Sequence, residues 1–496
     1  MRALAHASRA AAALALTALT ALLAACGEQR REPAPPPVAT ILQDDAELLH
    51  RPPAQIAATL DDIRDLGVDW VRVTAGWSVI APAPRSQRRP RFDARDPAAY
   101  PRDAWRALDR VDRMAGARGL RTAIDIAFWA PRWAVAARAR RGDRERDAID
   151  VEAYADFAEA VARRYSGAVA FTVWNEPNHN AFLLPQWERA AGGWRPAAPH
   201  LYRAMVHAAV PRIRAAAPGA IVLIGATSSV GSARGGDPDA RMAPLTFARE
   251  MACVDETLAP LERPECASFR PLPGDGWSHH PYSLELAPWQ PDPQDDAVRM
   301  ADLGRLTSLL ARLHERGRTA THLPLYLTES GYQTNPPDLT RAVALDEHAR
   351  WLPEAERIAR AEPSVRAVAQ FLMRDLPERP GGSLRARWGD YQSGLRFADG
   401  RPKPAHAAFA LPLVARRARS SRVAFWGLVR PGSGRRDARI EVRDAGGGWR
   451  TIARLRTRAD GSFDTTVAIG AGGTFRLRSG SLVGAAVQGA RQPAAG

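Results

Sequence analysis

The chain has 496 residues, of which 46% are hydrophobic and 25% are charged. This composition excludes an intrinsically disordered protein, and the length accommodates a catalytic domain of barrel size with a smaller module beside it. The formal net charge is +15, yet Lys403 is the only lysine, which argues against chemistry that needs a phosphate-loop lysine or a Schiff-base lysine.

The first 26 residues have the pattern of an export signal. Arg2 and Arg9 precede an apolar stretch over 10–25, and Cys26 follows directly after Leu-Ala-Ala. The apolar run is too short for a good membrane span and is typical of a secretory signal peptide. Its end resembles a bacterial lipoprotein signal, which implies lipid on Cys26 and a cell-envelope location; the alternative is an ordinary secretion signal. Residues 27–37 predict a polar, Pro-rich tether.

Between residues 38 and 415, short apolar runs alternate with amphipathic stretches. The apolar runs predict eight strands: Val38–Leu42, Val68–Thr74, Leu120–Ala127, Ala168–Trp174, Ile221–Ala226, Trp277–Tyr282, Leu325–Thr328 and Val365–Met373. The amphipathic stretches predict helices at Ala54–Leu66, Ala104–Ala117, Val151–Tyr165, Leu201–Ala216, Ala297–Arg316, Arg341–Ala361 and Ala405–Ala415. Apolar strands of this kind indicate a parallel sheet buried on both faces, and eight βα units fit a (β/α)8 barrel. A doubly wound open sheet is the structural alternative.

The two cysteines beyond the signal, Cys253 and Cys266, are separated by a loop-like stretch. In an exported protein a pair this close favours a disulfide over a redox or metal site.

Residues 416–496 have a different sequence pattern from the rest of the chain. Short β-branched and aromatic runs between Gly-rich turns predict a small all-β, sandwich-like module. From Ala415 onward there are 16 arginines and five acidic residues, so the module carries +11 of the +15 net charge. Two interpretations stay open: a solvated surface rich in arginine, or docking to an anionic envelope polymer or lipid surface.

Two predicted strands end in a glutamate. The fourth strand leads into Trp174-Asn175-Glu176-Pro177-Asn178, and the seventh leads into Thr328-Glu329. Barrel enzymes keep their chemistry at the carboxyl ends of the strands, and strands four and seven face each other across the barrel. Two carboxyl groups about 5 to 5.5 Å apart suit a retaining glycosidase, whereas a wider gap admits a water and gives inversion.

These motifs resemble the clan A glycoside hydrolases, and in particular families 5 and 39. The resemblance covers residues 38–415 and implies a retaining enzyme that cleaves O-glycosidic bonds of an oligo- or polysaccharide, with Glu176 as acid/base and Glu329 as nucleophile. It implies no cofactor. We expect no metal either, because the adjacent His279 and His280 point in opposite directions on a strand, and we expect no nucleic-acid partner.

The same resemblance implies roles for further side chains. Asn175 would bind the sugar 2-OH, Arg72 would lie beside the nucleophile, and Tyr282, in the His-x-Tyr pattern with His280, would contact the nucleophile. Trp129 and Trp133 resemble a segment that lines the sugar groove.

Strand eight departs from the family pattern, because it lacks the tryptophan that many members place under the sugar. Trp388 is a candidate substitute. Packing is the alternative role for Trp77, Trp277 and Trp388, and a carbohydrate-binding protein on a silent barrel is the alternative function. The sugar and its linkage stay open.

Overall fold

The computed structural model describes residues 37–136, 145–417, 421–469 and 473–491. The predicted signal peptide, nearly all of the tether and Cys26 lie outside these residues, so export and lipidation stay predictions. None of the helices in the described part of the chain is long and apolar enough to cross a membrane.

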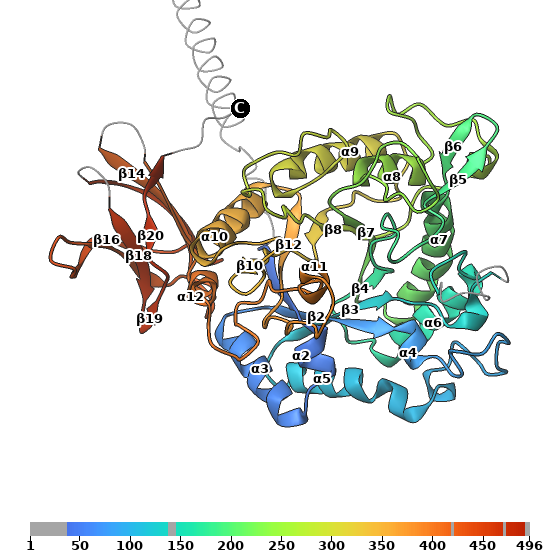
Figure 1. Ribbon diagram of the computed structural model, residues 1–496, viewed down its shortest axis with the longest axis horizontal. Helices are drawn as coiled ribbons and strands as arrows, with labels where there is room; N and C mark the ends of the chain where they lie inside the picture. The colour runs from blue at the N-terminus through green and yellow to red at the C-terminus, as the bar shows by residue number, and fades with distance from the viewer. Residues whose placement is uncertain (1–36, 137–144, 418–420, 470–472, 492–496) are drawn as a thin grey trace, which may run out of the picture. The chain divides into compact units, whose positions relative to one another are not determined.

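Eight parallel strands close into a barrel, as Figure 1 shows. Around the barrel the order is β1 (Ala39–Gln43), β12 (Val365–Phe371), β9 (Leu325–Leu327), β8 (Gly276–His280), β7 (Ile221–Ser228), β4 (Ala170–Val173), β3 (Arg121–Ala127) and β2 (Trp70–Gly76). This closed sheet confirms the (β/α)8 prediction and rules out a doubly wound open sheet.

Helices follow each strand of the barrel. They are α2 (Asp45–Leu49), α3 (Pro53–Asp65), α4 (Trp77–Ile80), α5 (Arg106–Gly116), α6 (Val151–Arg164), α7 (Ala198–Ala216), α8 (Pro244–Met251), α9 (Leu303–Glu315), α10 (Leu345–Ala361), α11 (Leu384–Arg387) and α12 (Pro404–Ala410). Short 3-10 helices lie at η1 (Pro97–Ala99), η2 (Arg102–Trp105), η3 (Arg132–Ala134), η5 (Pro264–Cys266) and η6 (Met300–Asp302).

Helix α6 illustrates how local sequence sets these boundaries. The side chain of Asp150 accepts a hydrogen bond from the backbone N–H of Ala153 at 3.0 Å, which caps the first turn. Two arginines occupy the last turn, where positive charge suits the helix dipole. Tyr154 and Phe157 are fully buried against the barrel, so the apolar face fixes the helix in place.

Two small two-stranded sheets were not predicted, namely the antiparallel pair β5 (Trp187–Ala190) with β6 (Gly193–Pro196) and the parallel pair β10 (Thr334–Asn335) with β11 (Val343–Ala344). The helix predicted over 405–415 was too long, since α12 ends at Ala410. Pro412 explains the early end, because a residue that precedes proline is disfavoured in helical conformation. The chain instead enters strand β13 (Leu413–Arg417), which crosses the predicted domain boundary.

The C-terminal module consists of two sheets, which fits the predicted all-β module. One has the order β17 (Ser462–Ala468), β14 (Arg422–Leu428), β13 and β21 (Ala490–Arg491); the other has β16 (Trp449–Arg456), β15 (Asp437–Arg443), β18 (Thr474–Ser479) and β19 (Leu482–Val483), with β20 (Val487–Gln488) also on β18. Phe425, Ile440 and Phe475 are buried in its core.

The predicted disulfide is present. Cys253 and Cys266 are bonded, with their Cα atoms 5.7 Å apart. The two sulfurs also lie near His200, but disulfide sulfurs are not thiolates and so do not act as zinc ligands.

Candidate active site

The turn after β4 directs Glu176 into the barrel mouth. Trp174 and Glu176 have φ values of +64° and +38°, in the left-handed region that non-glycine residues rarely adopt. The backbone N–H of Trp174 donates to the Tyr154 hydroxyl at 2.9 Å, and that of Glu176 donates to the Ala226 carbonyl at 2.9 Å. Such conformations cost about 1 to 3 kcal/mol each and persist only where the surroundings hold them. The fold therefore stabilises an unusual turn in order to aim one carboxylate.

Glu329, two residues beyond β9, is held on both oxygens. Arg72 Nη1 donates to Oε1 at 2.6 Å, and the Tyr282 hydroxyl donates to Oε2 at 3.0 Å. Burial alone would raise the pKa of this carboxyl, but the neighbouring His280 and Arg72, with the hydrogen bonds from Arg72 and Tyr282, hold the pKa below its ordinary value of 4.5. Glu329 is thus kept ionised near neutral pH.

The two glutamates meet through His280. Glu176 Oε1 lies 3.0 Å from His280 Nδ1, and the same nitrogen lies 3.7 Å from Glu329 Oε2. One oxygen of each carboxylate and one imidazole nitrogen all lie within 4.8 Å of one another. This spacing would suit a metal ion, but the positive charge of Arg72 already lies 2.6 Å from Glu329 and repels a second cation.

Arg72 is the centre of a buried network. Its guanidinium is 1% exposed, donates to the side-chain oxygen of Gln43, lies 3.1 Å from Asp125 Oδ2 and reaches Asn175 Oδ1 at 3.3 Å. Burial raises the pKa of Asp125 to about 7, an effect that Arg72 partly offsets. Sequence reasoning missed Gln43 and Asp125, although a carboxylate between Ile124 and Ile126 in an apolar strand was a usable signal.

The side-chain oxygen of Asn175 accepts a hydrogen bond from Arg72 Nη2 at 3.3 Å, so its amide nitrogen faces away from Arg72. His279, by contrast, is separate from the site. Its ring bonds Thr227 Oγ1 and the Val298 carbonyl, both at 2.9 Å, which agrees with the expectation that the adjacent histidines point in opposite directions.

The predicted tryptophans divide into three environments. Trp129 is 40% exposed, and its indole donates to the Ala181 carbonyl at 2.9 Å in the loop that follows Glu176. Trp133 does not line the groove, since it is 3% exposed and packs edge-on against Trp77 at 6.0 Å. Trp388 follows α11, and among the described residues no contact joins it to either glutamate.

Trp388 was the candidate for the aromatic ring after strand eight, but Phe371 and Tyr391 are the rings that lie near Tyr282 there. Phe371, the last residue of β12, packs edge-on against Tyr282 at 6.4 Å and against Tyr391 at 5.0 Å. Partial burial and the negative charges of Glu176 and Glu329 raise the pKa of the Tyr391 phenol. Tyr391 is 46% exposed, so its ring is open to a ligand in the mouth. Nothing in the local sequence pattern distinguished these two rings.

A closed (β/α)8 barrel with two facing carboxylates at its mouth suits the cleavage of glycosidic bonds, and the family comparison identifies the chain as a glycosidase. The chain belongs to glycosyl hydrolase family 5 (cellulase), whose family model matches residues 43–301, a little over half of the chain.

The chain is also similar to solved structures at low sequence identity. A family 39 glycoside hydrolase from the gut symbiont Bacteroides cellulosilyticus WH2 is 13% identical, with a TM-score of 0.50 over 87% of this chain and 81% of that chain. GH5_18 from Streptomyces cattleya, solved in complex with GlcNAc, is 16% identical, with a TM-score of 0.49 over 76% of this chain and 79% of that chain. A comparison with functionally curated proteins gave no match.

Proposed function

We propose that this glycosidase hydrolyses O-glycosidic bonds of an oligo- or polysaccharide with retention, using Glu329 as nucleophile and Glu176 as acid and then base. One observation carries the proposal: carboxylate oxygens of the two glutamates lie within 4.8 Å of each other. Retaining enzymes have carboxyl groups about 5 to 5.5 Å apart, whereas inverting enzymes need roughly 6.5 to 9.5 Å for a water molecule.

In the first step Glu329 forms a bond to the anomeric carbon while the bond to the leaving oxygen breaks. Glu176 gives its proton to that oxygen, and the sugar stays covalently attached to Glu329. In the second step Glu176 removes a proton from water as the water attacks the same carbon, which releases Glu329. Both changes need Glu176 to exist in two protonation states.

A hydrogen-bonded chain behind Glu176 suits both states. His280 Nδ1 faces Glu176, its Nε2 lies 3.1 Å from Thr328 Oγ1, and that hydroxyl lies 2.5 Å from Ser278 Oγ. A neutral imidazole donates from one nitrogen and accepts at the other, and a hydroxyl can do either. His280 can therefore accept from protonated Glu176 or donate to ionised Glu176, with Thr328 adjusting.

Substrate contacts follow from the same geometry. We assign the sugar 2-OH to Asn175, where a hydrogen bond would strengthen in the oxocarbenium-like transition state. Trp129, Phe371 and Tyr391 offer aromatic faces for sugar rings.

Activity on a panel of aryl glycosides tests the proposal against a silent barrel. We expect the wild-type chain to release phenol, Glu329→Gln to lose activity by about 10⁴-fold or more, and Glu176→Gln to keep substantial activity only on substrates with good leaving groups, which need little acid assistance. Binding without release of phenol by the wild-type chain would support the silent barrel instead.

We also propose an envelope location with lipid on Cys26, supported by the signal-like N-terminus, and an anionic envelope polymer as partner of the module, supported by its 16 arginines against five acidic residues.

A further inference from the structure

Arginines form a row across the outer face of one sheet of the C-terminal module. Ala438, Ile440 and Val442 of β15 point into the core, so Arg439, which alternates with them, lies on the opposite face. The strand register pairs Arg439 with Arg454 of β16 on one side and with Arg478 of β18 on the other. We call these three residues the arginine ladder.

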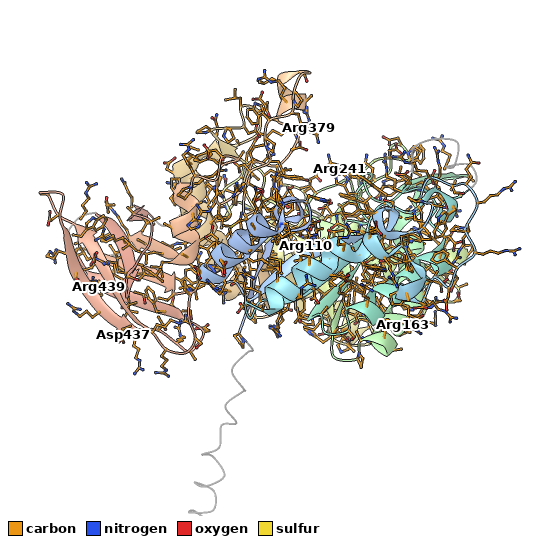
Figure 2. The ribbon with its side chains drawn as sticks, turned by 90° about the horizontal axis from the view of Figure 1, so that it is seen from below. Arg110, Arg163, Arg241, Arg379, Asp437 and Arg439 are labelled. Carbon is orange, nitrogen blue, oxygen red and sulfur yellow. A yellow bond between two sulfur atoms is a disulfide. The ribbon has the colours of Figure 1, made fainter. Side chains whose placement is uncertain are left out.

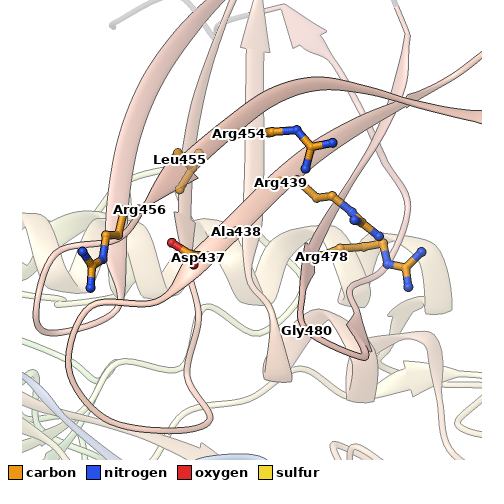
Figure 3. Close-up of a pocket in the computed structure, with 8 residues that line it drawn as sticks. All are labelled: Asp437, Ala438, Arg439, Arg454, Leu455, Arg456, Arg478 and Gly480. Carbon is orange, nitrogen blue, oxygen red and sulfur yellow. The ribbon is translucent and has the colours of Figure 1, made fainter.

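The ladder lies in an open hollow of about 580 Å³. Four arginines line it, the ladder and Arg456, with Asp437 as the one acidic lining residue. Figure 3 shows the side chains of Arg454, Arg439 and Arg478 in a row, with Arg456 and Asp437 set apart from them. The ladder therefore presents several positive charges to a single concave surface.

Few groups within the protein neutralise this charge. Glu441 Oε1 lies 3.0 Å from Arg439 Nε, but the same carboxylate also bonds Arg476 at 2.7 Å. The Nε atoms of Arg439 and Arg478 are buried without an aligned hydrogen bond among the described residues. Like charges directly opposite on neighbouring strands destabilise a sheet, so the ladder lowers stability unless an anion binds to it.

We infer that the arginine ladder binds an acidic polysaccharide, with the carboxylates of uronic acid residues paired to its guanidinium groups. The guanidinium fork matches a carboxylate in two parallel hydrogen bonds. Adjacent strands lie about 4.7 to 4.9 Å apart, so the three arginines form one short row. A polymer with a carboxylate on every sugar residue offers this row more than one carboxylate at a time.

Other occupants fit this surface less well. Trp449 is not a free platform for a neutral sugar, because Arg476 lies over its ring at 4.1 Å. A membrane would engage the apolar side chains of the next hairpin, Leu482 and Val483, which are 36% and 42% exposed, but a bilayer plane does not enter a hollow. The inference rests on the proposed function, since a polysaccharide ligand is the substrate class of a glycosidase.

Affinity of the full chain for polygalacturonate tests the inference, with dextran as the neutral polymer. The ladder variant carries Arg439→Gln, Arg454→Gln and Arg478→Gln. We expect the wild-type chain to bind polygalacturonate at low ionic strength, to release it by several hundred millimolar salt because of screening, and to ignore dextran. The ladder variant should bind at least tenfold more weakly.

A matched control removes the same charge elsewhere in the module, through Arg422→Gln, Arg435→Gln and Arg450→Gln, all of which are exposed. We expect its affinity to stay within threefold of wild type. If the triple ladder variant does not fold, the single change Arg454→Gln on the outermost strand β16 should still weaken binding measurably.

The inference would be overturned if the ladder variant bound polygalacturonate as tightly as wild type, or if the control variant lost as much affinity as the ladder variant. It would also be overturned if the chain bound phosphatidylglycerol vesicles through the ladder but did not bind polygalacturonate, which would indicate a membrane surface. Hydrolysis of an aryl glycoside by the ladder variant should match wild type. A chain that binds polygalacturonate through the ladder but never releases phenol would contradict the proposed function and leave the ladder standing.

Discussion

At the scale of single residues, His280 and Arg72 together keep the pKa of Glu329 low, and Arg72 is the fixed cation of the pair. Its guanidinium is surrounded by the carboxylates of Asp125 and Glu329 and by the side chains of Gln43 and Asn175. This guanidinium stays charged, because its attraction to Asp125 and Glu329 outweighs the cost of its burial and raises the pKa of Arg72. It selects the ionised form of Glu329 at the expense of the protonated form.

The pH profile of kcat/KM should report this effect. In the proposed mechanism Glu329 is ionised when it attacks, so activity falls as the pH drops through its pKa, and we expect the acidic limb of the wild-type profile below pH 4.5. Arg72→Gln removes the cation and leaves mutually repelling carboxylates. We expect the acidic limb to move to higher pH by one unit or more and kcat/KM to fall at least 100-fold.

Arg121→Gln is the control for this prediction. Arg121 lies at the start of β3, where its guanidinium stacks over Trp70 at 5.1 Å, away from the carboxyl ends of the strands. Its pH profile should match wild type. An unchanged acidic limb in Arg72→Gln would show that Arg72 does not set the ionisation of Glu329.

At the scale of secondary-structure elements, the sequence was most informative where periodicity was strong. The eight barrel strands were predicted because each is a short apolar run, and the two glutamates were found because each interrupts such a run at its carboxyl end. Phe371 and Tyr391 were missed because their role depends on contacts between β12 and a distant loop. Trp133 was misplaced because a groove tryptophan and a core tryptophan have the same local sequence.

Lys403 shows how an element can depend on one unusual residue. Its side chain is fully buried at the start of α12, and its Nζ donates to Thr334 Oγ1 at 2.6 Å, Asp375 Oδ1 at 2.7 Å and the Gln392 carbonyl at 2.9 Å. Three acceptors match the three donors of an ammonium, whereas the planar arginine fork would not. The single lysine therefore joins α12 to two loops at the barrel mouth.

At the scale of the whole molecule, the barrel and the module share a buried ion pair. Arg430 of the module is 6% exposed, donates to Glu356 of α10 at 2.8 Å and lies over the ring of Phe409 at 4.0 Å. Gly67, just past α3, has φ +76°, and a Cβ there would lie 2.6 Å from the Arg430 carbonyl. The two parts therefore meet over a tight contact.

Other arginines of the barrel domain are exposed, and Figure 2 labels three of them, Arg163, Arg241 and Arg379.

Stability should depend on this pair and on pH. Burial opposes ionisation of Glu356, but Arg430 and Arg360 lower its pKa from 4.5 to about 2. A lowered folded-state pKa stabilises the fold by about 3 kcal/mol above pH 4.5, and this stability is lost as the pH falls toward 2. We expect Glu356→Gln to lower the free energy of unfolding by about 3 kcal/mol at pH 7, since it also leaves Arg430 buried without its partner.

Urea unfolding at several pH values would measure this difference. Glu152→Gln is the control, because Glu152 is 71% exposed in its pair with Arg212 and exposed pairs contribute about 1 kcal/mol or less. The difference between Glu356→Gln and wild type should shrink below pH 4.5. A difference that is small at pH 7, or one that does not change with pH, would contradict the electrostatic role of Glu356.

The central claim is that Glu329 becomes covalently glycosylated. In an activated 2-deoxy-2-fluoro glycoside, the fluorine slows both steps and the good leaving group restores the first, so the glycosyl-enzyme accumulates. The protein can then be digested and the labelled peptide identified by mass spectrometry. The account predicts one added fluoro-sugar on the peptide that contains Glu329, no labelling of Glu329→Gln, and labelling retained in Glu176→Gln. A label on any other residue would contradict it.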